Sequence, residues 1–279
     1  MRGFIRGVGS YLPTLRESWI LVLLLTVGGT LLTAVVLFPL SFLPPSALAK
    51  FELLLYPLIF IPPLLYINRT IEKREEKRES PIPLKSANWG SAGVVPHFLL
   101  LLLLLFSVNY LIEPLTSWMG TPKFLEKLLD TIVKNKISSF ISLVLFAPIL
   151  EEIFCRAIIL RGLLYHTTPT KAIIWSSIIF GVIHLNPWQA IPAIIIGLVM
   201  GWVYWKSNSL WSTIFIHFVN NLFSYLITVL YPSLPADAGF KTLLPLNLYW
   251  YLYIVAAAVA ILSLIFINRQ YEHSIPAKI

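Results

Sequence analysis

The chain is built from long apolar segments that are separated by short polar ones. A transmembrane helix needs about 20 mostly apolar residues, and eight segments reach or approach that length. They span residues 19–43, 52–67, 97–116, 138–161, 171–187, 188–206, 210–231 and 246–268. The second and fifth are short for a span. The pattern predicts an all-α fold, a polytopic membrane helix bundle of about eight transmembrane helices that forms one domain over residues 1–279.

One polar segment, residues 121–136, has a helical pattern of its own. Its apolar residues recur at helical spacing with charged residues between them: Phe124, Leu125, Leu128, Leu129, Ile132 and Val133. Thr121 and Pro122 suit the N-cap and the first position of a helix. We expect an amphipathic helix that either lies on the outer membrane interface or shields a lateral opening of the bundle.

The composition is that of a membrane protein. Hydrophobic residues make up 57% of the chain and charged residues only 12%, against about 25% charged in a typical soluble domain. The single cysteine, Cys155, excludes an intramolecular disulfide and a cysteine-rich metal site. The net charge of +8 fits basic cytoplasmic loops better than nucleic-acid binding. We therefore expect the lipid bilayer, and no nucleic acid, as a partner.

The basic residues also predict the orientation in the membrane. With the N-terminus inside, the inner segments hold 14 Lys and Arg, and the outer segments hold 6. This asymmetry places both termini in the cytoplasm, and we expect a multi-pass protein of a prokaryotic plasma membrane. The first apolar run of about 25 residues is longer than the apolar core of a secretory signal, so we expect it to be retained as a span.

Three charged residues, Glu151, Glu152 and Arg156, lie in the middle of the stretch LFAPILEEIFCRAIILRG at 145–162, which belongs to the fourth apolar segment. On insertion scales, each charge at the centre of a bilayer costs about 2.5–3.5 kcal/mol. Glu152 and Arg156 are four positions apart and share a helix face, so they can form an ion pair. Glu151 is rotated by about 100° from Glu152 and lacks a local counter-charge, which suits a general base. The alternative is a purely structural cluster of charges.

Two further spans carry histidines at helical spacing from other residues. His184 lies one helical turn after Phe180, and His217 lies one turn before Asn221. If these side chains converge with Glu151, they can hold a water, take its proton and donate hydrogen bonds to an oxyanion. Alternatively, Glu151, His184 and His217 can ligate one divalent metal such as zinc. The motifs H-E-x-x-H and G-x-S-x-G, typical of metalloproteases and serine hydrolases, are absent.

Three short motifs occur in order along the chain: EEIFCR at 151–156, FGVIH at 180–184 and HFVNN at 217–221. They resemble the EExxxR, FxxxH and HxxxN motifs of the family of CAAX proteases and bacteriocin-processing enzymes, which includes the type II CAAX endopeptidases. The resemblance covers roughly residues 138–231, about a third of the chain, and marks this segment as the catalytic core. It implies an eight-helix membrane bundle with protease activity.

The resemblance also implies a role for each matching residue of the first two motifs. Glu151 is similar to the base that activates the attacking water, and His184 to the residue that helps to hold this water. Glu152 and Arg156 resemble the ion pair that supports the base.

In the third motif, His217 and Asn221 resemble the oxyanion donors. Members of the family have been interpreted both as metal-dependent and as glutamate-driven enzymes. We favour the metal-free route, because Asn221 beside His217 suits an oxyanion hole. Cys155 lies inside the first motif, but no base is assigned to it, and we expect it to be a buried hydrophobic residue.

Together these features predict an intramembrane endopeptidase whose site lies inside the membrane, nearer the cytoplasmic face. It would hydrolyse a peptide bond near the C-terminus of a membrane-associated protein, prenylated or not, or in a leader or bacteriocin-like peptide. A transporter is one alternative, because intramembrane Glu, Arg and His also mark ion and proton paths. A non-catalytic membrane scaffold is another.

Overall fold

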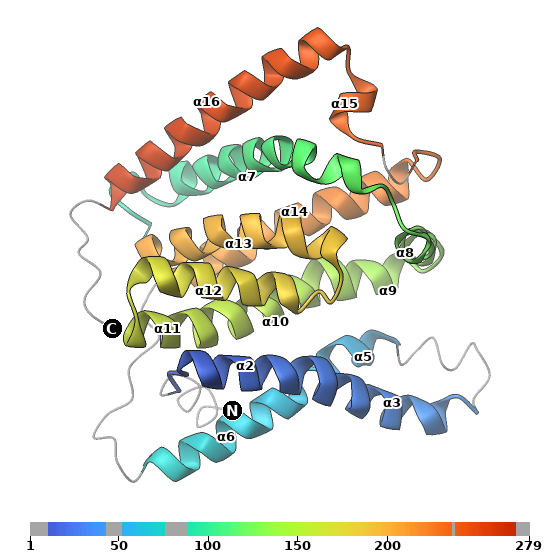
Figure 1. Ribbon diagram of the computed structural model, residues 1–279, viewed down its shortest axis with the longest axis vertical. Coiled ribbons are helices and arrows are strands. Elements are labelled where there is room, and N and C mark those ends of the chain that lie inside the picture. The colour runs from blue at the N-terminus through green and yellow to red at the C-terminus, as the bar shows by residue number, and fades with distance from the viewer. Residues whose placement is uncertain (1–10, 43–51, 76–88, 236–237, 272–279) are drawn as a thin grey trace.

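The computed structural model describes residues 11–42, 52–75, 89–235 and 238–271, and every regular element within these ranges is a helix (Figure 1). The first elements are α2 (Leu15–Leu23), the π-helical turn η1 (Leu24–Gly28), α3 (Gly29–Leu40), α5 (Glu52–Leu58) and α6 (Ile61–Glu75). We call these five elements the N-terminal layer. The described ranges thus confirm the predicted all-α fold.

The remaining helices form the rest of the bundle. Helix α7 (Val94–Thr116) leads through the short η2 (Ser117–Met119) to α8 (Lys123–Lys134). One uninterrupted helix follows, made of α9 (Lys136–Ser139), η3 (Phe140–Phe146), α10 (Ala147–Glu152), η4 (Ile153–Leu160) and α11 (Arg161–His166), in which η3 and η4 are π-helical. The last elements are α12 (Pro169–Val182), α13 (Pro187–Ser207), α14 (Leu210–Leu230), α15 (Phe240–Leu243) and α16 (Leu246–Gln270).

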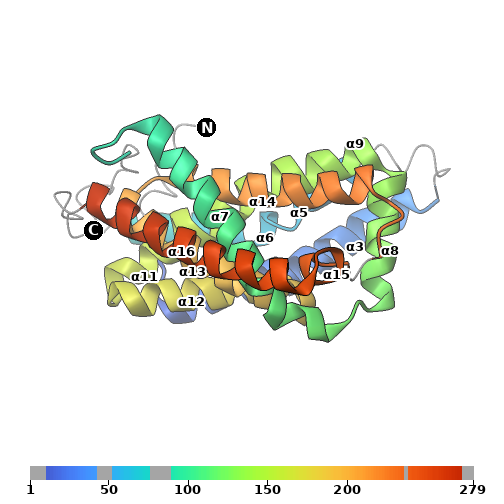
Figure 2. The ribbon, with the colours of Figure 1, turned by 90° about the horizontal axis from the view of Figure 1, so that it is seen from above.

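The long helices are stacked in layers. Figure 1 shows α16 and α7 at one end of the stack, α10 to α14 in the middle and the N-terminal layer at the other end. Helix α8 is seen end-on in Figure 1, and Figure 2 shows it crossing the ends of the other helices. The middle layers, which hold all three sequence motifs, are therefore covered on both sides.

Helices α12 and α13 pack closely because glycines line their contact. A Cβ atom on Gly197 would lie 3.3 Å from the Cα of Ser177, and one on Gly201 would lie 3.1 Å from Cγ2 of Ile173. Small residues let the backbones of membrane helices approach each other where no hydrophobic effect drives association. This contact holds Phe180 and the end of α12 in a fixed position beside α13.

Five helices in the described ranges are long and apolar enough to cross a membrane. They are Leu15–Leu40, Val94–Met119, Pro187–Ser207, Leu210–Leu230 and Leu246–Gln270, and α12 is a shorter apolar helix. The protein is therefore an integral multi-pass membrane protein, as predicted, and the number of eight spans stays a prediction.

The second predicted span, 52–67, is not one straight helix. It is divided between α5 and α6 at residues 59 and 60. Prolines surround this break, because Pro57 lies inside α5, and Pro62 and Pro63 lie at the start of α6. A proline lacks the backbone N–H of a helical hydrogen bond and clashes with the preceding turn. Beside this break, Tyr56 contacts Glu151 and Phe60 packs on Phe154, both in the middle of the bundle.

Two predicted local features differ from the structure. The amphipathic helix in 121–136 is present as α8, but Pro122 is its N-cap and makes no side-chain capping bond, so the expected N-cap role of Thr121 is wrong. The fifth predicted span ends early, because α12 has 14 residues, roughly 21 Å at about 1.5 Å per residue. The loop 183–186 that follows it carries His184.

Candidate active site

The ion pair expected between Glu152 and Arg156 is present and completely buried. Nη1 of Arg156 lies 3.0 Å from Oε1 of Glu152, and neither side chain is exposed. A second guanidinium nitrogen, Nη2, donates to the carbonyl of Gly197 on α13 at 3.4 Å. The pair therefore ties the π-helical segment η4 to α13. An ion pair this deep is stable only while both partners remain.

His217 joins this pair from helix α14. Its Nδ1 lies 3.0 Å from Oε1 of Glu152, the same oxygen that accepts from Arg156. Because an ionised carboxylate only accepts hydrogen bonds, Nδ1 carries a hydrogen. The other ring nitrogen, Nε2, then remains available to a partner on the opposite side of the ring. Glu152, and not Glu151, is thus the carboxylate that orients His217.

The ring of Phe180 packs against Arg156 and against both histidines. The guanidinium carbon of Arg156 lies 4.3 Å from the centroid of the Phe180 ring. The rings of His184 and His217 approach the same ring nearly at right angles, with centroids at 5.2 and 5.3 Å. Cation–π and edge-to-face contacts of this kind are attractive. The sequence indicated only the spacing of Phe180, and not its place between the three side chains.

His184 lies beyond the end of α12 and not on a helix, so its predicted position on a continuous span is wrong. Its Nδ1 lies 2.8 Å from the carbonyl oxygen of Phe180, and its own carbonyl accepts from Asn186 at 2.8 Å. Asn186 also caps α13 through the backbone N–H of Gln189. Between them, Leu185 adopts a φ of +58°, a conformation that costs a bulky residue about 1–3 kcal/mol. The loop is therefore held by specific bonds against local strain.

Glu151 points away from the Glu152–Arg156 pair, as its position on the helix predicts. Its Oε1 accepts a hydrogen bond from the hydroxyl of Tyr56 on α5. Its Oε2 is buried and makes no hydrogen bond within the described residues. Sequence reasoning missed Tyr56, because it is one of two tyrosines in an otherwise apolar segment and lies far from every motif.

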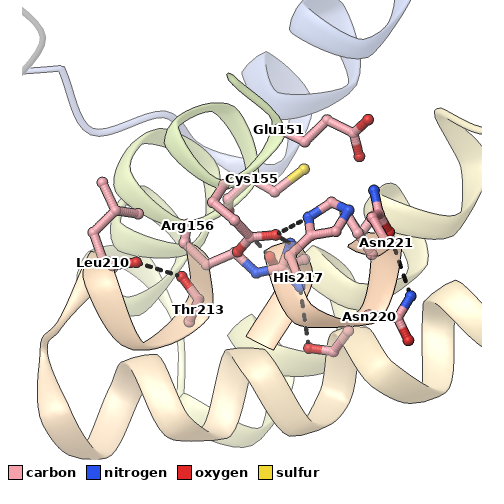
Figure 3. Close-up of polar contacts among 12 residues, drawn as sticks. Glu151, Cys155, Arg156, Leu210, Thr213, His217, Asn220 and Asn221 are labelled. Atoms are coloured by element: carbon pink, nitrogen blue, oxygen red, sulfur yellow. Dashed lines mark hydrogen bonds and ion pairs between the residues drawn. The ribbon is translucent and has the colours of Figure 1, made fainter. Parts of the chain in front are cut away.

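Asn221 is fixed by a bond to the π-helical segment η3. Its side-chain nitrogen donates to the carbonyl of Leu143 at 2.9 Å, and its oxygen accepts from Asn220 at 3.4 Å. Asn220 in turn accepts from Asn109 of α7 at 3.1 Å. Because an amide nitrogen has two hydrogens, one N–H of Asn221 remains after the bond to Leu143. Figure 3 shows Glu151, His217 and Asn221 projecting toward one another from α10 and α14.

These side chains meet at one cavity of about 360 Å³, within the usual range for ligand pockets. The predicted site residues that line it are Glu151, His184, His217 and Asn221. Further polar lining comes from Tyr56, Gln189, Thr26 and Thr30, and the apolar lining includes Leu128 of α8. Glu152 and Arg156 lie behind this wall. Non-helical backbone such as the His184 loop is tolerated at membrane depth where it lines a cavity.

The side chains at the cavity include the kinds of residue that bind metal ions, namely two histidines and a carboxylate. Both histidines hold Nδ1 in a hydrogen bond and keep Nε2 for another partner, as metal-ligating histidines do. However, within the described residues no three His, Cys, Asp or Glu side chains are grouped closely enough to hold a metal ion. The placement of Glu151, His184 and His217 therefore does not fit a metal site. Cys155 is a free, buried thiol and is absent from the cavity wall.

The fold and the site together describe a polytopic membrane protein with a polar cavity inside its bundle. Residues 133–223 match the family model described as Type II CAAX prenyl endopeptidase Rce1-like, and this range contains all three motifs. The match bears out the family resemblance that the three motifs indicated, over about a third of the chain. No curated protein and no solved structure matches the chain.

Proposed function

We propose that the protein is an intramembrane endopeptidase that cleaves peptide bonds with a water activated by Glu151. The observation that carries the proposal is the meeting of Glu151, His184, His217 and Asn221 at one cavity. These residues come from α10, the loop after α12, and α14. An intramembrane cavity that gathers ionisable side chains is a functional site by default, because such groups are costly in a bilayer.

The water is held and activated by two groups. Oε2 of Glu151 has no competing hydrogen bond in the described residues, so it can take a proton from the water. Nδ1 of His184 donates to the carbonyl of Phe180, which leaves a lone pair on Nε2 that can accept the second hydrogen of the water. The resulting hydroxide attacks the carbonyl carbon of the scissile bond.

The charge that develops on the carbonyl oxygen meets donors on the other side of the cavity. Asn221 supplies its remaining N–H. His217 donates through Nε2 when the ring is an imidazolium, and Glu152 beside Nδ1 stabilises that cation. When the C–N bond breaks, the proton on Glu151 passes to the leaving nitrogen. One water is consumed, and a carboxylic acid and an amine are formed.

The substrate class follows from the family and the cavity. The description of the matching family supports a prenylated C-terminal segment, and a leader or bacteriocin-like peptide is the alternative substrate. Leu128 on α8 contributes to the cavity wall, and the ring of Phe124 packs on Trp188 with centroids 5.7 Å apart. Helix α8 therefore shields one side of the cavity, in line with the second expectation for this segment.

The test is cleavage by the purified protein in proteoliposomes. A farnesylated C-terminal peptide and a leader-type peptide are incubated with it in H₂¹⁸O, and the products are identified by mass spectrometry. We expect one ¹⁸O atom in the new carboxylate and a loss of about 10²–10⁴-fold in rate for Glu151→Gln. Glu126→Gln, the same change on the exposed face of α8, serves as the control. Cleavage by Glu151→Gln at the wild-type rate would refute the proposal.

A further inference from the structure

Among the described residues, the N-terminal layer makes one direct polar contact with the proposed catalytic residues, and this contact is to Glu151, the proposed base. Tyr56 and Glu151 are 95 positions apart in the chain, yet the Tyr56 hydroxyl donates to Oε1 of Glu151. Tyr56 lies outside residues 133–223, so no motif of the family model includes it. It also lines the catalytic cavity.

We propose that Tyr56 is the positioning residue of the catalytic base: its hydroxyl fixes Oε1 of Glu151, so that Oε2 is the one oxygen left to accept the proton of the water. This inference rests on the proposed function. A carboxylate rotates easily about its last side-chain bond, and a charge-assisted hydrogen bond to one oxygen restricts that rotation. Tyr56 keeps its own proton during the reaction and exchanges no atom with the substrate.

The ring of Tyr56 is itself held in place by packing. It lies 5.9 Å from the ring of Phe60, which lies 6.0 Å from the ring of Phe154 on η4. Helix α5 also packs against η3, the segment just before the helix that carries Glu151. The hydroxyl therefore reaches Glu151 from a rigid support. Such support is needed because a reactive group must be placed to within a fraction of an ångström.

The first test is the kinetics of Tyr56→Phe, which keeps the ring and removes the hydroxyl. We expect kcat to fall about 10- to 100-fold, as for the loss of a hydrogen bond to a charged group, with KM changed less than about twofold. Tyr66→Phe is the matched control, because Tyr66 lies in the same layer and its hydroxyl makes no hydrogen bond in the described part of the chain. Wild-type kcat in Tyr56→Phe would overturn the inference.

The second test measures the contact without activity. Unfolding temperatures in detergent are compared for wild type, Tyr56→Phe, Glu151→Ala and the double variant, which form a double-mutant cycle. We expect Tyr56→Phe to lower the unfolding temperature in the wild-type background and to have no effect once Glu151 is Ala. Equal shifts in both backgrounds would overturn the inference. If the wild type cleaves none of the peptides, the proposed function fails, and the cycle still decides whether Tyr56 holds Glu151.

Discussion

The family-matched region, residues 133–223, and the N-terminal layer line the same cavity with very different side chains. The polar side chains of the matched region at this cavity are a carboxylate, two imidazoles and two amides. The N-terminal layer contributes Thr26, Thr30 and Tyr56, and both threonines donate to carbonyls of their own helix, Val22 and Thr26, at 2.9 and 2.6 Å. Only Tyr56 turns its hydroxyl toward the site.

The two regions also differ in how their polar side chains are satisfied, within one helix in the N-terminal layer and between helices in the matched region. In the N-terminal layer the hydroxyls of Thr26 and Thr30 are both satisfied by their own helix, so replacement of either one disturbs one helix only. In the matched region Glu152 is shared by Arg156 and His217, which come from two different helices. Loss of any one of these three side chains leaves a buried polar group of the other two without its partner. A buried charge without a partner costs several kcal/mol.

The largest effect expected in the matched region is on stability. Arg156→Ala strands the carboxylate of Glu152 and should lower the free energy of unfolding by about 3–5 kcal/mol, with loss of cleavage. Glu152→Gln should act in the same direction, whereas Glu151→Gln should leave the fold intact. Thr30→Ala in the N-terminal layer is the control with little expected change. Unfolding in detergent measures all four, and an equal loss in Glu151→Gln and Arg156→Ala would contradict the division of roles between the two carboxylates.

The elements that depend on local periodicity were predictable from sequence, and those that depend on distant contacts were not. The spans and α8 follow from apolar residues at helical spacing. The π-helical segments η3 and η4 lie inside one predicted span and have no periodic pattern that marks them. The loop at His184 did have a local signal, because Asn186 and Pro187 suit the N-cap and the first position of the next helix, and the predicted span 171–187 ran through it.

In the candidate site, too, the residues within local motifs were predictable from sequence and their distant partners were not. The three motifs named Glu151, His184, His217 and Asn221, which the structure brings to one cavity. Their partners are less visible in the sequence. Tyr56 reaches Glu151 only because α5 and α10 are neighbours in the folded bundle, and no spacing along the chain encodes that contact.

A smaller effect is expected from the oxyanion donor. Asn221→Ala removes the free N–H and should lower kcat by about 10²–10³-fold with little change in KM. It also removes the bond to Leu143, so the unfolding temperature is measured in parallel. Asn109→Ala is a useful comparison, because it disturbs the same chain of amides without reaching the cavity. A KM effect without a kcat effect would contradict the oxyanion role.

The metal content of the purified protein is an independent test of the proposed oxyanion role of Asn221. In the metal-free mechanism, treatment with a chelator leaves cleavage by wild type unchanged, and the purified protein binds no stoichiometric zinc. If one equivalent of zinc is bound and is required for cleavage, the donor role of Asn221 is wrong, and the assignment as a protease stands. Metal analysis before and after chelation, paired with the peptide assay, separates the two cases.

The smallest effect is expected at the one cysteine of the chain. Cys155 is fully buried and free, its carbonyl accepts from Ser176 of α12 at 3.2 Å, and its side chain is absent from the cavity wall. A buried thiol of this kind acts as a small hydrophobic residue, so Cys155→Ala should keep most of the wild-type kcat. The loss of one buried sulfur should cost about 1 kcal/mol of stability. Because water and not sulfur attacks the substrate, a thiol reagent should leave turnover unchanged, and loss of turnover in a fully folded Cys155→Ala would overturn this reading.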